Sequence, residues 1–226
     1  MKKRNLNRRT ALQVGFGAAI GSVAGTAFAN SAREAEACAT PHQTEGPFFP
    51  KKDQLDKDAD LTMVQGRSEP AQGEEIYVRG TVLDESLSPV AGAIVDIWQA
   101  NTHGRYHHED DPNPAPVDPN FQGWAKLKTD EEGTFGLKTI VPGAYPAAGD
   151  WWRPPHIHFK VAKRGYHELT TQMYFSGHEL NDKDGILQEL TKDEQDRVVV
   201  DFKPSSGEPA VMTGHFNVMI KKVRRG

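Results

Sequence analysis

Short segments that alternate apolar and polar residues constrain the fold of this chain more than any other feature. In residues 76–83 and 93–98, apolar side chains recur at every second position, which is the period of a strand with one buried face. Turn sequences such as residues 130–133 (Asp-Glu-Glu-Gly) separate further segments of this kind. The additional candidate strands are residues 123–129, 133–140, 156–162, 169–175, 197–202 and 215–223.

The composition supports the same fold class. The 226 residues include 21 glycines and 15 prolines spread along the chain, which suits short strands joined by turns better than a helical bundle. The only helix we expect is a short one around residues 184–190. We therefore predict an all-β protein: a single β-sandwich domain over residues 40–226, made of two mainly antiparallel sheets with long functional loops and little helix.

The first 29 residues read as an export signal that precedes the fold. Residues 1–9 carry five positive charges, residues 10–30 carry none, and Ala27-Phe28-Ala29 is a small-x-small cleavage pattern. Adjacent Arg8 and Arg9 before an apolar pair resemble a twin-arginine signal. We expect export to the periplasm or beyond and no stable membrane insertion once the signal is removed. An uncleaved anchor is the alternative, and residues 30–39 read as a flexible lead-in.

Charge and cysteine content exclude several classes of partner and site. Without the five basic residues of the signal, 22 basic residues stand against 31 acidic ones, a formal charge of −9. A chain with this net negative charge repels the phosphate backbone of nucleic acids, so we expect no nucleic-acid partner. The lone Cys38 permits neither an internal disulfide nor a thiolate metal cluster.

Two histidines in one predicted strand are the sharpest sign of chemistry. In residues 152–159, His156 and His158 are two positions apart, so both imidazoles project from one face while Ile157 faces the other way. Paired neutral imidazoles are half of a typical metal site. An ordinary pair of strand histidines is the alternative, and three further histidines at positions 103, 107 and 108 lie in another loop.

Two tyrosines in loops could supply the missing oxygen ligands. Tyr106 lies in the long connection of residues 99–120, and Tyr145 follows Pro142-Gly143-Ala144. As phenolates they would be hard anionic ligands suited to Fe(III). Deprotonating a free phenol at pH 7 costs about 4 kcal/mol, which a trivalent cation can supply. For either tyrosine alone, a half-buried ring with its hydroxyl in water is the alternative.

Four short motifs follow one another along the chain: residues 104–106 (Gly-Arg-Tyr), 142–146 (Pro-Gly-Ala-Tyr-Pro), 152–158 (Trp-Arg-Pro-Pro-His-Ile-His) and 172–175 (Gln-Met-Tyr-Phe). In this order they resemble the motifs of the intradiol ring-cleavage dioxygenases, most closely the iron-bearing chains of the protocatechuate 3,4-dioxygenases. The resemblance covers nearly all of residues 40–220, including an opening segment at residues 40–47. It carries the expectation of a non-haem Fe(III) enzyme that opens a catechol-type ring with O2 to a muconate-type diacid.

The resemblance also implies a role for each matching residue. Tyr106 and His156 match equatorial iron ligands, and Tyr145 and His158 match axial ones. Arg153 matches an arginine that stabilises charge on the substrate ring, although a surface ion pair is its alternative, and Gln172 matches a glutamine in the pocket wall. The implied catalytic set is Tyr145, Arg153 and Gln172. The implied partners are a small aromatic diol and O2, and a homo- or hetero-oligomer stays open.

Departures from the family pattern leave the substrate undefined. Only seven residues separate Tyr145 from Arg153, and Pro155 stands where alanine is common. The polar stretch before residue 76 does not resemble the helical dimerisation region of catechol 1,2-dioxygenases. Two other functions compete with the dioxygenase reading. One is an exported copper- or zinc-binding sandwich, such as a superoxide dismutase or metal carrier. The other is a transthyretin-like binding module, which residues 80–84 and 89–93 resemble.

Overall fold

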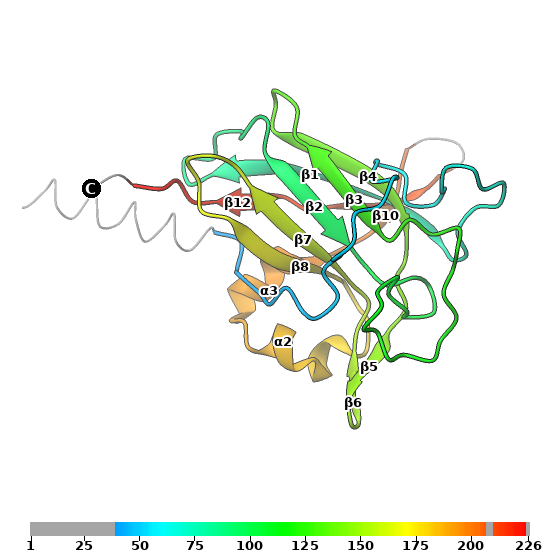
Figure 1. Ribbon diagram of the computed structural model, residues 1–226. Helices are drawn as coiled ribbons and strands as arrows, with labels where there is room; N and C mark the ends of the chain where they lie inside the picture. Colours follow the sequence, from blue (N-terminus) through cyan, green and yellow to red (C-terminus); the bar gives the residue numbers. More distant parts are fainter. Residues whose placement is uncertain (1–38, 207–209, 225–226) are drawn as a thin grey trace, which may run out of the picture. The chain divides into compact units, whose positions relative to one another are not determined.

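The computed structural model describes residues 39–206 and 210–224 and contains two five-stranded sheets packed face to face (Figure 1). In the first sheet, β4 (Thr134–Ile140) pairs with β1 (Glu75–Asp84), which also neighbours β11 (Met212–His215) and β12 (Val218–Ile220), with β10 (Lys203–Pro204) at the edge. The second sheet has the order β3 (Trp124–Lys128), β2 (Ile94–Trp98), β7 (His156–Ala162), β8 (Leu169–Phe175) and β9 (Val199–Val200). The predicted all-β sandwich is confirmed.

The main core fills the space between the sheets. Alternate residues of β1, among them Ile76, Val78 and Val82, are buried while their neighbours are more exposed. Phe159 of β7 crosses the gap, with its ring centroid 4.8 Å from that of Phe216. Alternation of this kind is what the sequence pattern encoded, because every second side chain of a strand faces the same side.

Most strand pairings are antiparallel as predicted, and each sheet also contains parallel pairings that the sequence analysis did not anticipate. β1 pairs in parallel with β11 and then with β12, and β8 pairs in parallel with β9. The change of partner along β1 occurs at Gly80, where a β-carbon would lie closer than 3.0 Å to the Phe216 carbonyl oxygen. The strand predicted over residues 215–223 is therefore broken after His215, and the Asn217 side chain accepts a bond from the Thr81 N–H at 3.0 Å.

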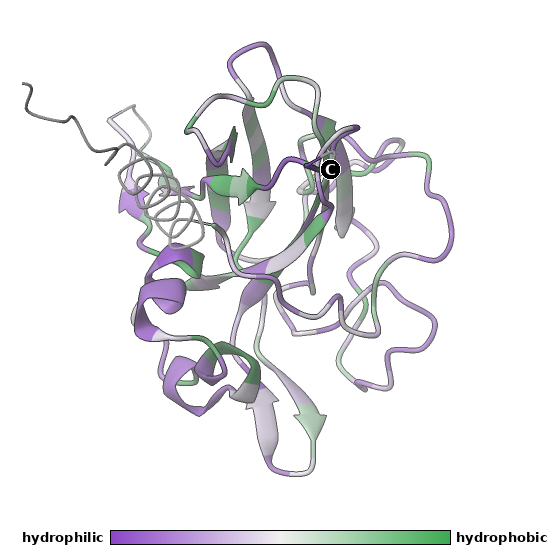
Figure 2. Ribbon diagram, turned by 90° about the vertical axis from the view of Figure 1, so that its left-hand side faces the viewer, coloured by the Kyte–Doolittle hydropathy of each residue, from purple (hydrophilic) through white to green (hydrophobic). Residues whose placement is uncertain are grey.

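Helix is slightly more abundant than predicted. The expected helix exists as α2 (Gly185–Gln188), but η1 (Asn181–Lys183) and α3 (Lys192–Val198) accompany it, so the expectation of a single helix was wrong. Thr191 and Glu194 form a capping box that starts α3, and α3 occupies the first two residues of the strand predicted at 197–202. Figure 2 colours the helical region mostly hydrophilic. Within the described ranges, no helix is long and apolar enough to span a membrane.

A two-stranded hairpin, β5 (Tyr145–Ala148) and β6 (Trp151–Arg153), projects from one end of the sandwich (Figure 1). The sequence analysis did not predict it. The hairpin pairs Tyr145 directly with Arg153, so two predicted site residues share one short element. The predicted signal, the lead-in up to residue 38 and Cys38 lie outside the described residues.

Candidate metal centre

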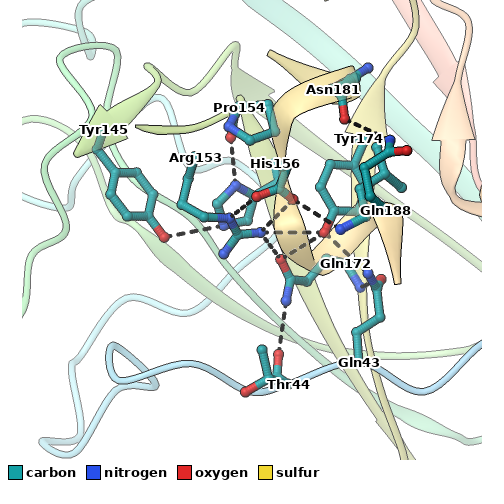
Figure 3. A network of polar contacts seen from close by, with 12 residues as sticks. Gln43, Thr44, Tyr145, Arg153, Pro154, His156, Gln172, Tyr174, Asn181 and Gln188 are labelled. Carbon is teal, nitrogen blue, oxygen red and sulfur yellow. Dashed lines mark hydrogen bonds and ion pairs between the residues drawn. The ribbon is translucent and has the colours of Figure 1, made fainter. Parts of the chain in front are cut away.

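The four predicted ligands come together from three separate segments of the chain. His156 and His158 project from the same face of β7, with ring centroids 4.9 Å apart. The hydroxyl oxygens of Tyr106 and Tyr145 each lie 3.4 Å from Nε2 of His156. All four side chains are at least 93% buried. Two phenols and two imidazoles thus lie together in the buried interior, and Figure 3 draws Tyr145 and His156 of this group.

The imidazole of His156 presents a lone pair to the two tyrosines. Its Nδ1 lies 2.6 Å from the carbonyl oxygen of Pro154. A carbonyl only accepts hydrogen bonds, so Nδ1 carries the proton and Nε2, on the tyrosine side, does not. The ring of His158 is held differently, stacked on Trp98 with centroids 4.7 Å apart and planes 8° from parallel.

Burial and charge set the protonation of these groups. Burial, followed by the charge of Arg153, lowers the pKa of His156 and of His158 well below the ordinary value, so both imidazoles are neutral. Burial raises the pKa of both tyrosines, and the charge of Arg153 only partly opposes this. The site by itself therefore holds neutral imidazoles and neutral phenols, and forming phenolates here requires a further cation.

Two glycines allow the tyrosine-bearing loops to cross. A β-carbon added at Gly143 would lie closer than 3.0 Å to the Gly104 amide nitrogen and the Thr102 carbonyl oxygen. One added at Gly104 would lie equally close to the carbonyl oxygen of Ala144. Both glycine N–H groups donate to the Asn101 carbonyl oxygen, at 2.9 and 3.0 Å. The loops approach backbone to backbone, and this contact sets the separation of the two tyrosines.

Side-chain caps fix the loop that carries Tyr106. Oδ1 of Asn101 accepts the N–H groups of His103 and Arg105, at 2.9 and 3.0 Å. Oδ2 of Asp111 accepts the N–H of Tyr106 itself at 2.7 Å. Polar side chains that bond to nearby backbone in this way stabilise irregular segments. The long connection of residues 99–120 is thus an ordered scaffold for the phenol of Tyr106.

Arg153 is buried rather than on the surface, so the surface ion pair considered as its alternative does not form. Its Nε donates to Oδ1 of Asp184 at 2.8 Å. Its Nη2 donates to Oε1 of Gln172 at 2.7 Å and to the hydroxyl of Tyr174 at 3.3 Å. Figure 3 shows the guanidinium between His156 and the Gln172–Tyr174 pair. A fixed cation thus lies beside the four candidate ligands.

Comparison with known proteins decides the family. Residues 44–221 match the family described as Dioxygenase. The chain is 38% identical over 179 residues to the protocatechuate 3,4-dioxygenase beta chain of Burkholderia cepacia, which covers 77% of this chain and 76% of that relative. The chain belongs to the intradiol ring-cleavage dioxygenases.

Solved structures agree with this assignment. The dioxygenase superimposes on 3-chlorocatechol 1,2-dioxygenase from Rhodococcus opacus 1CP with a TM-score of 0.66 at 26% identity, covering 86% of this chain and 78% of that one. It also matches the dioxygenase domain of a dioxygenase and carbohydrate-binding fusion from the cellulolytic bacterium Streptomyces sp. SirexAA-E. That match has a TM-score of 0.61 at 28% identity and covers 82% of this chain and 99% of that one.

Several residues around the dioxygenase site were missed by the sequence analysis. Gln43 donates to the Tyr174 hydroxyl at 3.1 Å and accepts the N–H of Gln172 at 3.0 Å. The ring of Phe48 lies 4.8 Å from that of Tyr106. Asp184 is fully buried against Arg153. Gln43 lies in the opening segment of residues 40–47 that resembled the family, and Phe48 directly follows it, which was the available signal. Asp184 had no signal beyond its position before a short helix.

The second group of histidines lies apart from the four candidate ligands. Oε1 of Gln72 lies 3.1 Å from Nε2 of His103, and the side chain of His107 is exposed. His108 is buried and packs against Phe48, at a centroid distance of 5.8 Å. His108 lines a cleft of the dioxygenase that also reaches Trp98 and Tyr106.

Proposed function

We propose that this dioxygenase binds one ferric ion through Tyr106, Tyr145, His156 and His158 and cleaves a catechol-type ring with O2. The bond broken would join the two hydroxylated carbons, and the product would be a muconate-type diacid. The observation that carries the proposal is the convergence of both phenol oxygens on the unprotonated nitrogen of His156.

The chemistry of the donor set supports iron over the competing metals. Among the residues that the structure describes, no group of three or more His, Cys, Asp or Glu side chains is placed to bind a metal. The available donors are two neutral imidazoles and two buried phenols. Imidazole suits zinc, copper and iron alike, whereas phenolate oxygen is a hard anionic ligand that suits Fe(III), so the two phenols are the donors that favour iron. The residues present therefore fit a ferric ion.

Bound there, a ferric ion would favour ionised phenols and catechol hydroxyls and would draw electron density from the ring. The chain's own groups then have separate tasks. The Tyr145 oxygen can accept a proton from a substrate hydroxyl. The Arg153 guanidinium can stabilise negative charge that develops on the ring, since it is fixed in a poorly solvated site. Phe48 and Trp98 cover the site and limit access of water.

The substrate class follows from the site and the relatives together. Two adjacent hydroxyls are the feature shared by the substrates named for the relatives, protocatechuate and 3-chlorocatechol. We propose a small aromatic diol of this class, with O2 as the second substrate.

Oxygen consumption by the iron-loaded protein tests this function directly. We expect uptake of one O2 per diol with at least one of catechol, protocatechuate and hydroxyquinol, and an intradiol diacid as the product. The purified protein should be red-brown and contain about one iron per chain, from tyrosinate ligation. A blue or colourless protein that holds copper or zinc and consumes no oxygen with any diol would contradict the proposal.

We also propose that residues 1–29 act as a twin-arginine signal that exports the folded enzyme. The adjacent Arg8 and Arg9, the uncharged stretch after them and the Ala-Phe-Ala pattern support this. The double variant Arg8→Lys and Arg9→Lys should leave the protein in the cytoplasm with its signal uncleaved. Arg4→Lys keeps the same charge outside the motif and should be exported normally. Equal export of the wild type, the double variant and Arg4→Lys would contradict the proposal.

A further inference from the structure

A buried carboxylate lies directly behind the catalytic arginine. Asp184 is 0% exposed and, with Arg153, forms an ion pair in which both side chains are almost completely enclosed. Removing one charge of such a pair leaves the other uncompensated in a medium of low polarity. The hydrogen bonds of Asp184 are with Arg153 and with the N–H of Leu187, so its direct link to the site is through that arginine.

The carboxylate and its neighbours engage one edge of the guanidinium. The N–H of Nε donates to Asp184, and Nη2 has acceptors on Gln172 and Tyr174, with Oδ2 of Asp184 more distant at 3.4 Å. Nη1 makes no hydrogen bond within residues 39–206 and 210–224. A planar guanidinium held along one edge has a defined direction for the other edge. The free Nη1 edge is the part of Arg153 that remains for a substrate.

The same carboxylate begins helix α2. Oδ2 of Asp184 accepts the N–H of Leu187 at 3.1 Å, as an N-cap residue does. Oδ1 therefore accepts the short bond from Arg153, while Oδ2 caps the helix and also lies 3.4 Å from Nη2 of Arg153. This arrangement ties the orientation of the guanidinium to the backbone of α2, more than thirty residues further along the chain.

We propose that Asp184 is a positioning residue for ring cleavage, which holds the Nε edge of Arg153 so that Nη1 faces the substrate. The catalytic part of this inference rests on the proposed function, whereas the positioning of Arg153 does not. Gln172 and Tyr174 accept hydrogen bonds from Nη2 of Arg153 and bond to each other. Gln43, near the start of the described chain, bonds to both of them.

The variant Asp184→Asn separates positioning from folding. Its amide oxygen can keep the bond to the Leu187 N–H, while its NH2 group then faces the Nε of Arg153 and repels it. We expect kcat to fall roughly 10- to 100-fold, since fixed charge at a reacting centre is worth factors of this size or more. We expect KM to change less than about threefold and the visible absorption of the iron-loaded protein to stay as in the wild type.

Asp84→Asn is the matched control. Asp84 is also buried, with one oxygen on the backbone N–H groups of Ser86 and Ser88 and the other on Lys222, far from the site in the first sheet. It should keep wild-type kcat. If Asp184→Asn also keeps kcat within about threefold, or if it loses the visible band, the proposal is overturned.

A double-mutant cycle tests whether Asp184 acts through Arg153. The pair Arg153→Gln and Asp184→Asn removes both buried charges, so the double variant avoids an isolated one. We expect its kcat to equal that of Arg153→Gln alone within about threefold, because the positioned group is already gone. Multiplicative losses would show an independent role and overturn the proposal.

A crystal structure of Asp184→Asn keeps the test independent of turnover. Displacement of the guanidinium from Gln172 would support positioning even if no diol were a substrate, in which case only the proposed function would fail. A guanidinium that stays within hydrogen-bond distance of Gln172 in the variant would overturn the inference.

Discussion

The crossing of the two tyrosine loops predicts a large effect of a single methyl group. In Gly143→Ala, the new β-carbon would lie closer than 3.0 Å to backbone atoms of Thr102, His103 and Gly104, and none of these can rotate away as a side chain would. Gly143 does not have a positive φ, so the effect of the substitution is steric alone. The loops must therefore separate.

The magnitude follows from the cost of overpacking. Forcing extra volume into a packed region typically costs about 1–3 kcal/mol, and contact with three backbone atoms places this variant at the upper end. For a domain of this size, about 2–3 kcal/mol lowers Tm by roughly 5–10 °C. Separating the loops also moves the phenols of Tyr106 and Tyr145 apart, so iron affinity should fall with stability.

Thermal unfolding of the metal-free protein measures the first effect, and iron content with visible absorption measures the second. Gly136→Ala is the control, since its β-carbon would meet Arg79 and Val78 at an ordinary 3.7 Å. It should unfold within about 2 °C of the wild type. A Gly143→Ala protein with wild-type Tm and a full complement of iron would refute the view that this crossing sets the tyrosine geometry.

Three further measurements test other parts of the site and fold. Tyr106→Phe should lose iron and the visible tyrosinate absorption, whereas Tyr166→Phe, in the loop between β7 and β8, should keep both; full colour and activity in the first variant would remove Tyr106 from the site. Removing iron should lower Tm by roughly 10 °C, which is the shift expected for a ligand present at about 1,000 times its Kd. Below the unfolding transition, the far-ultraviolet circular dichroism of the metal-free protein should equal that of the iron-loaded protein. Burial opposes ionisation of Asp84, but Lys222 and the N–H groups of Ser86 and Ser88 hold the pKa of its carboxyl below the ordinary value. The ionised form therefore stabilises the fold above about pH 4, so the difference in Tm between wild type and Asp84→Asn should narrow as the pH falls from 5 to 2; a constant difference would contradict this.

Elements with a regular period could be predicted from the sequence, and those set by tertiary contacts could not. β7 and β8 have the predicted bounds because a turn sequence that contains Gly165 separates two strand-forming segments, although almost every residue of both strands is buried. The β5–β6 hairpin was missed because its strands are four and three residues long and one contains Pro146. Helix α3 was missed although its capping box is legible at Thr191, since the apolar residues after it suggested a strand.

The residues of the site also fall into those that the sequence predicted and those that only the tertiary structure revealed. The paired histidines follow from the two-residue period of a strand, and their grouping with two tyrosines came from the family resemblance. That Gly104 and Gly143 touch, or that Asp184 reaches Arg153, depends on how loops pack across the fold. No local pattern encodes a contact of that kind, so a sequence can supply the ligand types while the structure supplies what holds them in place.

Contacts within the chain hold the four candidate ligands in place. β7 is paired on both sides, with β2 and β8, so the two imidazoles are fixed by the sheet. The phenols are fixed by the glycine crossing and by the bond from the Tyr106 N–H to Asp111. Small metal domains that are unfolded without their ion lack a large core, whereas here the candidate ligands stand on a sandwich with a core between its two sheets. The fold should therefore form first and bind iron afterwards, an order that would allow the metal to be loaded before the proposed export of the folded chain.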